Sequence, residues 1–182
     1  GAQVIEIDGK KEVSQAMREL LFAVGLSLFL IFIILYLQFG SMVHSFIIML
    51  AIPFGLVGVL LSLYLFDSTL SLNSGLGFIL LSGIACAHSI MLVEMILTKK
   101  KAGCSAYDAV IETVRERIRP ILITSITTIL GMFPIALGVG EGGKVLQPLG
   151  IAVCGGLWIS LLFSLFIIPA LEYSYLLREE KR

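Results

Sequence analysis

One apolar stretch of the sequence carries side chains that can hold or pass on a proton. Between Gly83 and Glu94 it places His88 directly before Ser89, and this is the only imidazole that we expect at membrane depth. Imidazole titrates near neutral pH and has two ring nitrogens, so it can carry a proton. Ionisable side chains are costly in hydrocarbon and normally face a bundle interior or water. We therefore expect the helix that carries His88 to be the functional helix of the chain.

The same helix offers a second possible chemistry, the binding of a soft metal ion. His88, Met91 and Met95 are spaced by three and four residues, which places them on one face of a helix. Imidazole and thioether ligands suit an ion such as Cu(I). Methionine in an apolar chain is more often a packing residue, so we expect no metal site and no cofactor here.

Composition sets the class of protein and excludes several functions. The 182 residues are 58% hydrophobic, well above the apolar share of ordinary soluble domains. The formal net charge is zero, so no global field favours nucleic acid as a partner. The three cysteines are scattered and form no disulfide or zinc-finger pattern. We find no pairing of a nucleophile with a base and expect no enzymatic activity.

Five apolar segments are long enough to cross a bilayer as helices, and they define the fold class as an all-α membrane protein. The last of them repeats a small residue at every fourth position, at Ala152, Gly156, Ser160 and Ser164, which predicts a close-packing face. Residues 20–177 thus form the transmembrane region, and residues 178–182 form a tail. The expected spans are about 20–37, 46–66, 76–97, 121–140 and 148–171.

Two polar segments lie outside these spans. Residues 4–9 alternate in polarity and end in Asp-Gly, which predicts a short extramembrane strand within the lead-in 1–19. Its partner strands would have to come from elsewhere, because one strand is not stable alone. Residues 105–119 open with a capping box, Ser105 and Asp108, and then place apolar residues at helical spacing. They predict a separate amphipathic helix in the cytoplasmic membrane interface.

The distribution of basic residues predicts the orientation in the membrane. With the N-terminus outside, nine Lys and Arg residues lie on the cytoplasmic side and four lie outside. Six of the nine fall between the third and fourth spans. The positive-inside rule therefore predicts a cytoplasmic C-terminus. The chain begins with Gly1 rather than Met, so we expect its N-terminus to be a fragment boundary.

Several strings, in the right order along nearly the whole chain, resemble the resistance–nodulation–division (RND) exporters of the bacterial inner membrane. The resemblance is to the C-terminal part of their second repeat, namely the last strand of the periplasmic porter region and five of the six membrane helices. The strings that carry the resemblance are Gln38–Ser41, Gly83–Glu94, Arg117–Ser125, Gly131–Pro134 and Gln147–Val153.

The resemblance implies proton-driven export by a homotrimer of much longer chains, in which a polar relay between central helices couples proton entry to conformational cycling. Thr124 and Arg117 match the family's relay threonine and arginine, whereas Ala87 stands where multidrug members carry a lysine and His88 where asparagine is common. The aspartate pair of the relay belongs to the first repeat, which this chain lacks. The implied partners are therefore the lipid bilayer, the first-repeat helices and the porter domain, in the same or another chain.

Two functional interpretations remain open at this point. The chain is either the membrane portion of an RND exporter, or a truncated or split-gene subunit that assembles with other helices and does not itself transport. In the first case His88, Thr124, Arg117 and Ser89 are proton-relay candidates. In the second, His88 is a neutral core residue and the Thr124 hydroxyl bonds to its own helix. If the bundle resembles that of the family, His88 and Thr124 should face one interior seam rather than lipid, because desolvation of unpaired polar groups is costly.

Overall fold

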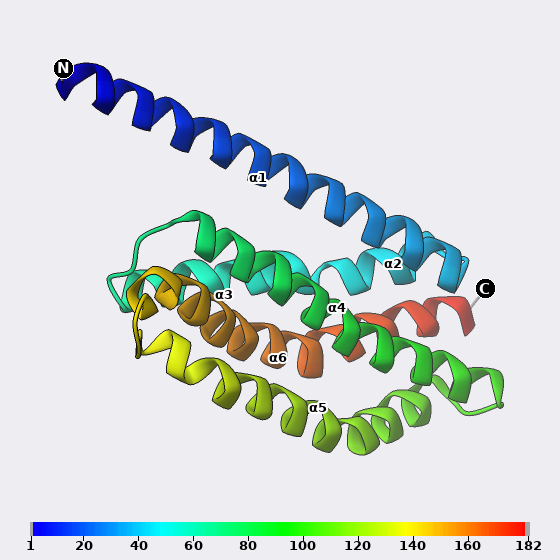
Figure 1. Ribbon diagram of the computed structural model, residues 1–182. Coiled ribbons are helices and arrows are strands. Elements are labelled where there is room, and N and C mark those ends of the chain that lie inside the picture. The colour runs from blue at the N-terminus through cyan, green and yellow to red at the C-terminus, as the bar shows by residue number, and fades with distance from the viewer. Residues whose placement is uncertain (1, 181–182) are drawn as a thin grey trace.

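The computed structural model describes residues 2–180, which form six helices and no strand (Figure 1). Helix α6 lies in the middle of the bundle, packed against α3, α4 and α5, while α1 runs along one side (Figure 1). Five helical segments of the described chain are long and apolar enough to cross a membrane, which confirms the predicted fold class. The helices are α1 (Ala2–Phe39), α2 (Met42–Met49), α3 (Ala51–Leu65), α4 (Leu72–Lys101), α5 (Ala106–Ala136) and α6 (Gly143–Glu180).

The predicted strand at residues 4–9 is wrong, because these residues belong to α1. A strand needs neighbours to accept its backbone hydrogen bonds, and no described residue supplies a ladder. A helix satisfies its backbone within one segment, so the first span extends backward through the polar lead-in. The alternation over six residues was too short to distinguish the two structures.

The separate amphipathic helix is also wrong, because residues 106–136 form one continuous helix, α5, with Pro120 inside it. Proline removes one backbone donor, yet membrane helices tolerate it when neighbouring groups compensate. The start of α5 is capped as the sequence suggests, since the Ser105 hydroxyl accepts a bond from the Asp108 amide at 3.1 Å. The amphipathic segment therefore continues the fourth span rather than lying apart from it.

The second span is divided into α2 and α3 at Leu50. Pro53 has no N–H to bond to the carbonyl of Met49, which accounts for the break at this position. Gly40, which precedes α2, has a φ of 61°, a backbone conformation that glycine adopts without strain. α2 is thus a short helix with an interruption on either side.

Close packing at the centre of the bundle depends on the small residues of α6. The predicted face at Ala152, Gly156, Ser160 and Ser164 is buried along its whole length, as expected. A Cβ atom at the neighbouring Gly155 would overlap the side chain of Ser62 on α3. Small side chains let the α3 and α6 backbones approach, which is how helices associate in lipid.

Candidate functional site

The central polar contact of the site joins His88 on α4 to Thr124 on α5. Their Nε2 and Oγ1 atoms lie 3.3 Å apart, and His88 is only 9% exposed. The two side chains therefore contact one another between α4 and α5, with His88 buried and Thr124 exposed. Thr124 also donates back to its own helix, with the carbonyls of Pro120 and Ile121 at 3.1 and 3.0 Å.

These contacts favour one arrangement of the hydrogen atoms in the pair. A threonine hydroxyl has one hydrogen, and the two carbonyls can only accept it. The hydroxyl oxygen is then free to accept a hydrogen bond from Nε2–H of His88. Nδ1 is the ring nitrogen left to accept a proton, and a protonated imidazole keeps the bond to Thr124. The geometry thus allows the imidazole to take up and release a proton without losing its anchor.

The His88–Thr124 contact lies at the edge of an uncovered face made of small side chains. Thr124 and Ala87 are exposed. Gly83 on α4 and Gly131 on α5 have no heavy atom within 4 Å of where a Cβ would stand. Small residues on a membrane helix permit close approach by another helix. We call this surface the open face; it is defined by Gly83, Ala87, Thr124 and Gly131.

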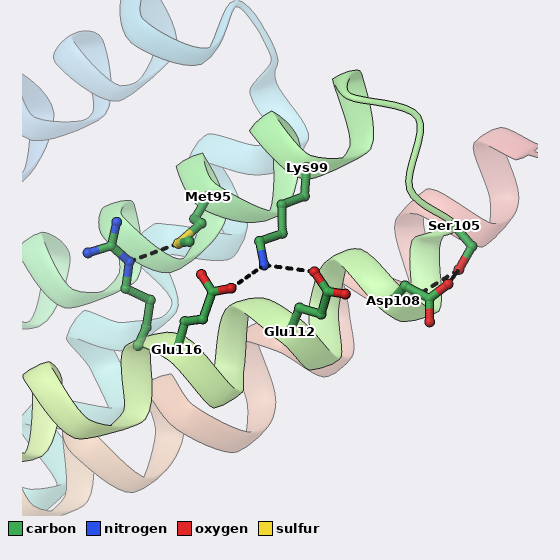
Figure 2. Close-up of polar contacts among 7 residues, drawn as sticks. Met95, Lys99, Ser105, Asp108, Glu112 and Glu116 are labelled. Carbon is green, nitrogen blue, oxygen red and sulfur yellow. Dashed lines mark hydrogen bonds and ion pairs between the residues drawn. The ribbon is translucent and has the colours of Figure 1, made fainter.

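A polar cluster farther along the same helix pair fastens α5 to α4 (Figure 2). The ammonium group of Lys99 donates to Glu112 at 2.9 Å and to Glu116 at 2.8 Å. Arg117 donates from Nε to the sulfur of Met95 at 2.9 Å. Arg117 precedes Thr124 by seven residues, which is two helical turns, so both lie on one face of α5. The cluster therefore fixes the segment that positions Thr124.

Ser89 lies on the side of α4 that faces α6 rather than on the side of Thr124. Its hydroxyl is fully buried, donates to the Ala85 carbonyl at 2.9 Å and lies 3.2 Å from the Ser164 hydroxyl. The structure brings Arg117 and Thr124 to one face, and it places Ser89 in the packing between α4 and α6. Packing and hydrogen bonding in the core account for the position of Ser89 without a role in proton transfer.

The methionines of the possible soft-metal face differ in their surroundings. Met91 is 40% exposed, whereas the sulfur of Met95 accepts the hydrogen bond from Arg117. Among the described residues there is no group of three or more His, Cys, Asp or Glu side chains that could hold a metal ion. The sulfur of Met95 is therefore occupied by a contact with Arg117.

Sequence reasoning missed a second buried imidazole, His44 on α2. Its Nδ1 lies 2.9 and 3.0 Å from the two carboxylate oxygens of Glu172 on α6. Glu172 is completely buried and His44 is 7% exposed. Both residues fall just outside the expected spans 46–66 and 148–171, where a solvated side chain is the usual expectation. Their separation of 128 positions hides the contact from any local pattern.

Comparison with known proteins gives matches along almost the whole chain. The sequence profile described as the AcrB/AcrD/AcrF family matches residues 6–176. The swarming motility protein SwrC of Bacillus subtilis (strain 168) is 33% identical over 172 residues, which are 94% of this chain and 16% of SwrC. The multidrug resistance protein MdtC of Erwinia tasmaniensis is 37% identical over 153 residues, or 84% of this chain and 15% of MdtC.

Metal-related proteins also match. The nickel-cobalt-cadmium resistance protein NccA of Alcaligenes xylosoxydans xylosoxydans is 33% identical over 94% of this chain and 16% of its own length. A crystal structure of a heavy metal efflux pump superposes with a TM-score of 0.80 at 31% identity, covering 94% of this chain and 16% of the pump. The chain thus spans about a sixth of the length of the relatives it matches.

Proposed function

This chain belongs to the AcrB/AcrD/AcrF family, and from that premise we propose that it is the membrane-embedded portion of a proton-driven efflux transporter. The resemblance of its sequence to RND exporters is confirmed by the family match. The chain is accordingly part of a multi-pass bacterial membrane protein. The proposal adds that this part carries proton-relay residues of the exporter.

The observation that carries the proposal is the His88–Thr124 contact at the edge of the open face. An imidazole at membrane depth is expensive unless it has a partner or a function, and here its partner is a threonine that matches the family relay. Nδ1 of His88 is the atom that takes up a proton. Thr124 orients the ring, and Arg117 lies two turns away on the same face of α5.

The open face is where we propose that the missing part of the exporter packs. In the resembling family the relay also needs an aspartate pair from the first repeat, and Ala87 leaves space where the family lysine stands. Small side chains at this face allow another helix to approach His88 closely. A carboxylate brought there would face the imidazole, and a proton could then pass between the two. The partners are therefore the first-repeat helices and the porter domain, assembled as a trimer in the lipid bilayer.

The proposed setting is the bacterial inner membrane, with a periplasmic N-terminus and a cytoplasmic C-terminus. The basic residues that support this orientation gather at one end of the bundle, where α4 ends and α5 begins. The relatives are named for multidrug resistance and for nickel, cobalt and cadmium resistance. We propose that the exported substrate is a drug-like molecule or a metal ion.

A second candidate function is a subunit that assembles with other helices and does not transport. The observation in its favour is Ala87, which cannot supply the positive charge that holds a relay aspartate ionised. Under this alternative His88 is a core residue whose bond to Thr124 only joins α4 to α5. The two functions differ in whether proton movement depends on that bond.

The test is a chimaera in which residues 6–176 replace the matching segment of a full-length relative. It is reconstituted in vesicles with a pH-sensitive dye. Thr124→Val removes the hydroxyl next to His88, and we expect a loss of proton flux of about fivefold, the value of one hydrogen bond of about 1 kcal/mol.

Thr127→Val is the matched control for this test, because Thr127 is exposed and bonds to the Ile123 carbonyl on its own helix. Its proton flux should equal that of the unsubstituted chimaera. Equal flux in the two variants would favour the subunit that does not transport.

A further inference from the structure

The His44–Glu172 contact is a buried ionisable pair outside the proposed relay. Both Glu172 oxygens lie within hydrogen-bond distance of the same imidazole atom, Nδ1, at 2.9 and 3.0 Å. The pair joins the first turn of α2 to the last part of α6. It lies near the end of the bundle at which α4 terminates (Figure 1). His88 precedes Lys99 at that end by eleven residues, or about 16 Å along α4, so the two imidazoles occupy separate regions.

A fully buried carboxylate requires a positive partner or a proton. Removing water from an ionised carboxylate costs several kcal/mol unless an opposite charge and hydrogen bonds compensate. With a proton on the imidazole, the pair is His⁺ and Glu⁻ and has no net charge. Without that proton, a neutral His44 leaves a net charge of −1 inside the protein. The pair is therefore most stable as His⁺ and Glu⁻. This state holds one proton more than a neutral imidazole beside an ionised carboxylate.

Among the described residues, the ion pair with His44 is the one salt bridge that Glu172 makes. Tyr175 of α6 packs edge-on against the His44 ring, with centroids 5.2 Å apart. Arg178 lines the neighbouring groove between α2 and α6, and it is exposed. α1, α3 and α4 contribute buried apolar residues to the hydrophobic cluster that contains Ile47 and Ile48 of α2. The buried thiol of Cys86 belongs to the same cluster. Other charged or titratable side chains on the facing elements include Tyr36, Glu94 and Lys101, which are exposed, and Lys99 and Lys100, which are paired with carboxylates of α5 and α6. On α6 itself, Tyr173 is half-buried, and the exposed Glu179 accepts a hydrogen bond from Tyr175 at 3.4 Å.

The difference in exposure indicates the path that a proton takes. Glu172 has no exposed surface, whereas His44 keeps 7% of its surface. A proton from water therefore binds to the imidazole rather than to the carboxylate: Nε2 receives it, and Nδ1–H stays on the ionised Glu172. In this proton uptake, water or hydronium gives up one proton, and the net charge of the His44–Glu172 pair changes from −1 to zero.

We propose that His44 and Glu172 form a proton-binding site that fastens α2 to α6 and is separate from the His88 site. α2 is a short helix between Gly40 and the break at Leu50. The pair is its one ionic connection to α6 among the described residues. Loss of the proton leaves an uncompensated buried charge and weakens this connection.

The test uses the whole 182-residue chain in lipid nanodiscs, with histidine labelled by the stable nitrogen isotope for NMR. The chain has two histidines, so a His44→Gln variant assigns both sets of ring signals. We expect His44 in the unsubstituted chain to show the ring signals of an imidazolium whose Nδ1–H is hydrogen-bonded to a carboxylate. Glu172→Gln keeps the shape and a hydrogen-bond acceptor but removes the charge. This variant should lose the imidazolium signals of His44 and leave those of His88 unchanged.

Glu179→Gln is the matched control, because Glu179 lies two turns farther along α6 and is exposed. It should leave the His44 signals unchanged. The proposal is overturned if His44 stays imidazolium in Glu172→Gln. It is also overturned if His44 of the unsubstituted chain is neutral under the conditions of this comparison, and this measurement needs no variant to fold. Neither result bears on His88 and Thr124, so the proposed function would stand.

Discussion

Substitution of Gly83 separates the stability of the chain from its assembly with a partner. Gly83 lies inside α4, and an added Cβ would have no heavy atom within 4 Å. Alanine should therefore stabilise the isolated chain by about 0.5–1 kcal/mol, because glycine in a helix loses more conformational freedom. At Gly155 an added Cβ would overlap Ser62, so Gly155→Ala should destabilise the chain by about 1–3 kcal/mol.

The assay is unfolding of the detergent-solubilised chain by a denaturing detergent, followed by circular dichroism. The two alanine variants should move the free energy of unfolding in opposite directions. In the full-length chimaera Gly83→Ala should lose its stabilising effect relative to Gly155→Ala, because a larger residue at position 83 would displace a helix packed on the open face. Gly83→Leu should then abolish export while the isolated chain remains folded. A loss of stability in Gly83→Ala as large as that in Gly155→Ala would refute the assignment of Gly83 to an open face.

Further predictions concern the end of the bundle where α4 meets α5, and the chain taken alone. Lys99→Met removes two ion pairs to half-exposed carboxylates, so unfolding should become only slightly easier, with the difference vanishing in high salt. Ser105→Ala removes the cap of α5 and should cost about 1 kcal/mol in the same unfolding assay. In a cysteine-free background, an impermeant thiol reagent applied to intact cells should label a cysteine near Lys10 in preference to one near Lys100; the reverse would contradict the proposed orientation. The chain alone in vesicles should carry no proton current, and a current abolished by His88→Ala would contradict the need for a partner.

The parts of the fold that follow from local pattern could be predicted from the sequence. Five long apolar segments define five spans, since length and hydropathy decide whether a helix can cross a bilayer. The contact between His88 and Thr124 agrees with an expectation that combined the family resemblance with the cost of desolvating polar groups in lipid. Both inferences depend on a strong energetic term that acts within one segment or between two adjacent ones.

The remaining features depend on tertiary contacts that no local pattern contains. Glu172 borders an expected span and looks like a solvated residue until α2 is packed against it with His44. The start of α1 has an alternating sequence that fits a strand, yet a helix needs no partner for its backbone. Pro120 marked a plausible helix boundary, but capping at Ser105 and the polar cluster around Lys99 support one continuous helix. In each case the larger structure outweighs a short sequence signal.

The central claim is that the rest of an RND exporter packs on the open face beside His88. The most direct measurement is cysteine crosslinking in the chimaera, after replacement of the three native cysteines. Ala87→Cys is paired with a cysteine on the aspartate-bearing helix of the first repeat, and Val57→Cys, which is 56% exposed on α3, is the control. We predict an efficient crosslink from position 87 and none from position 57. A crosslink from position 57 with none from position 87 would contradict the account.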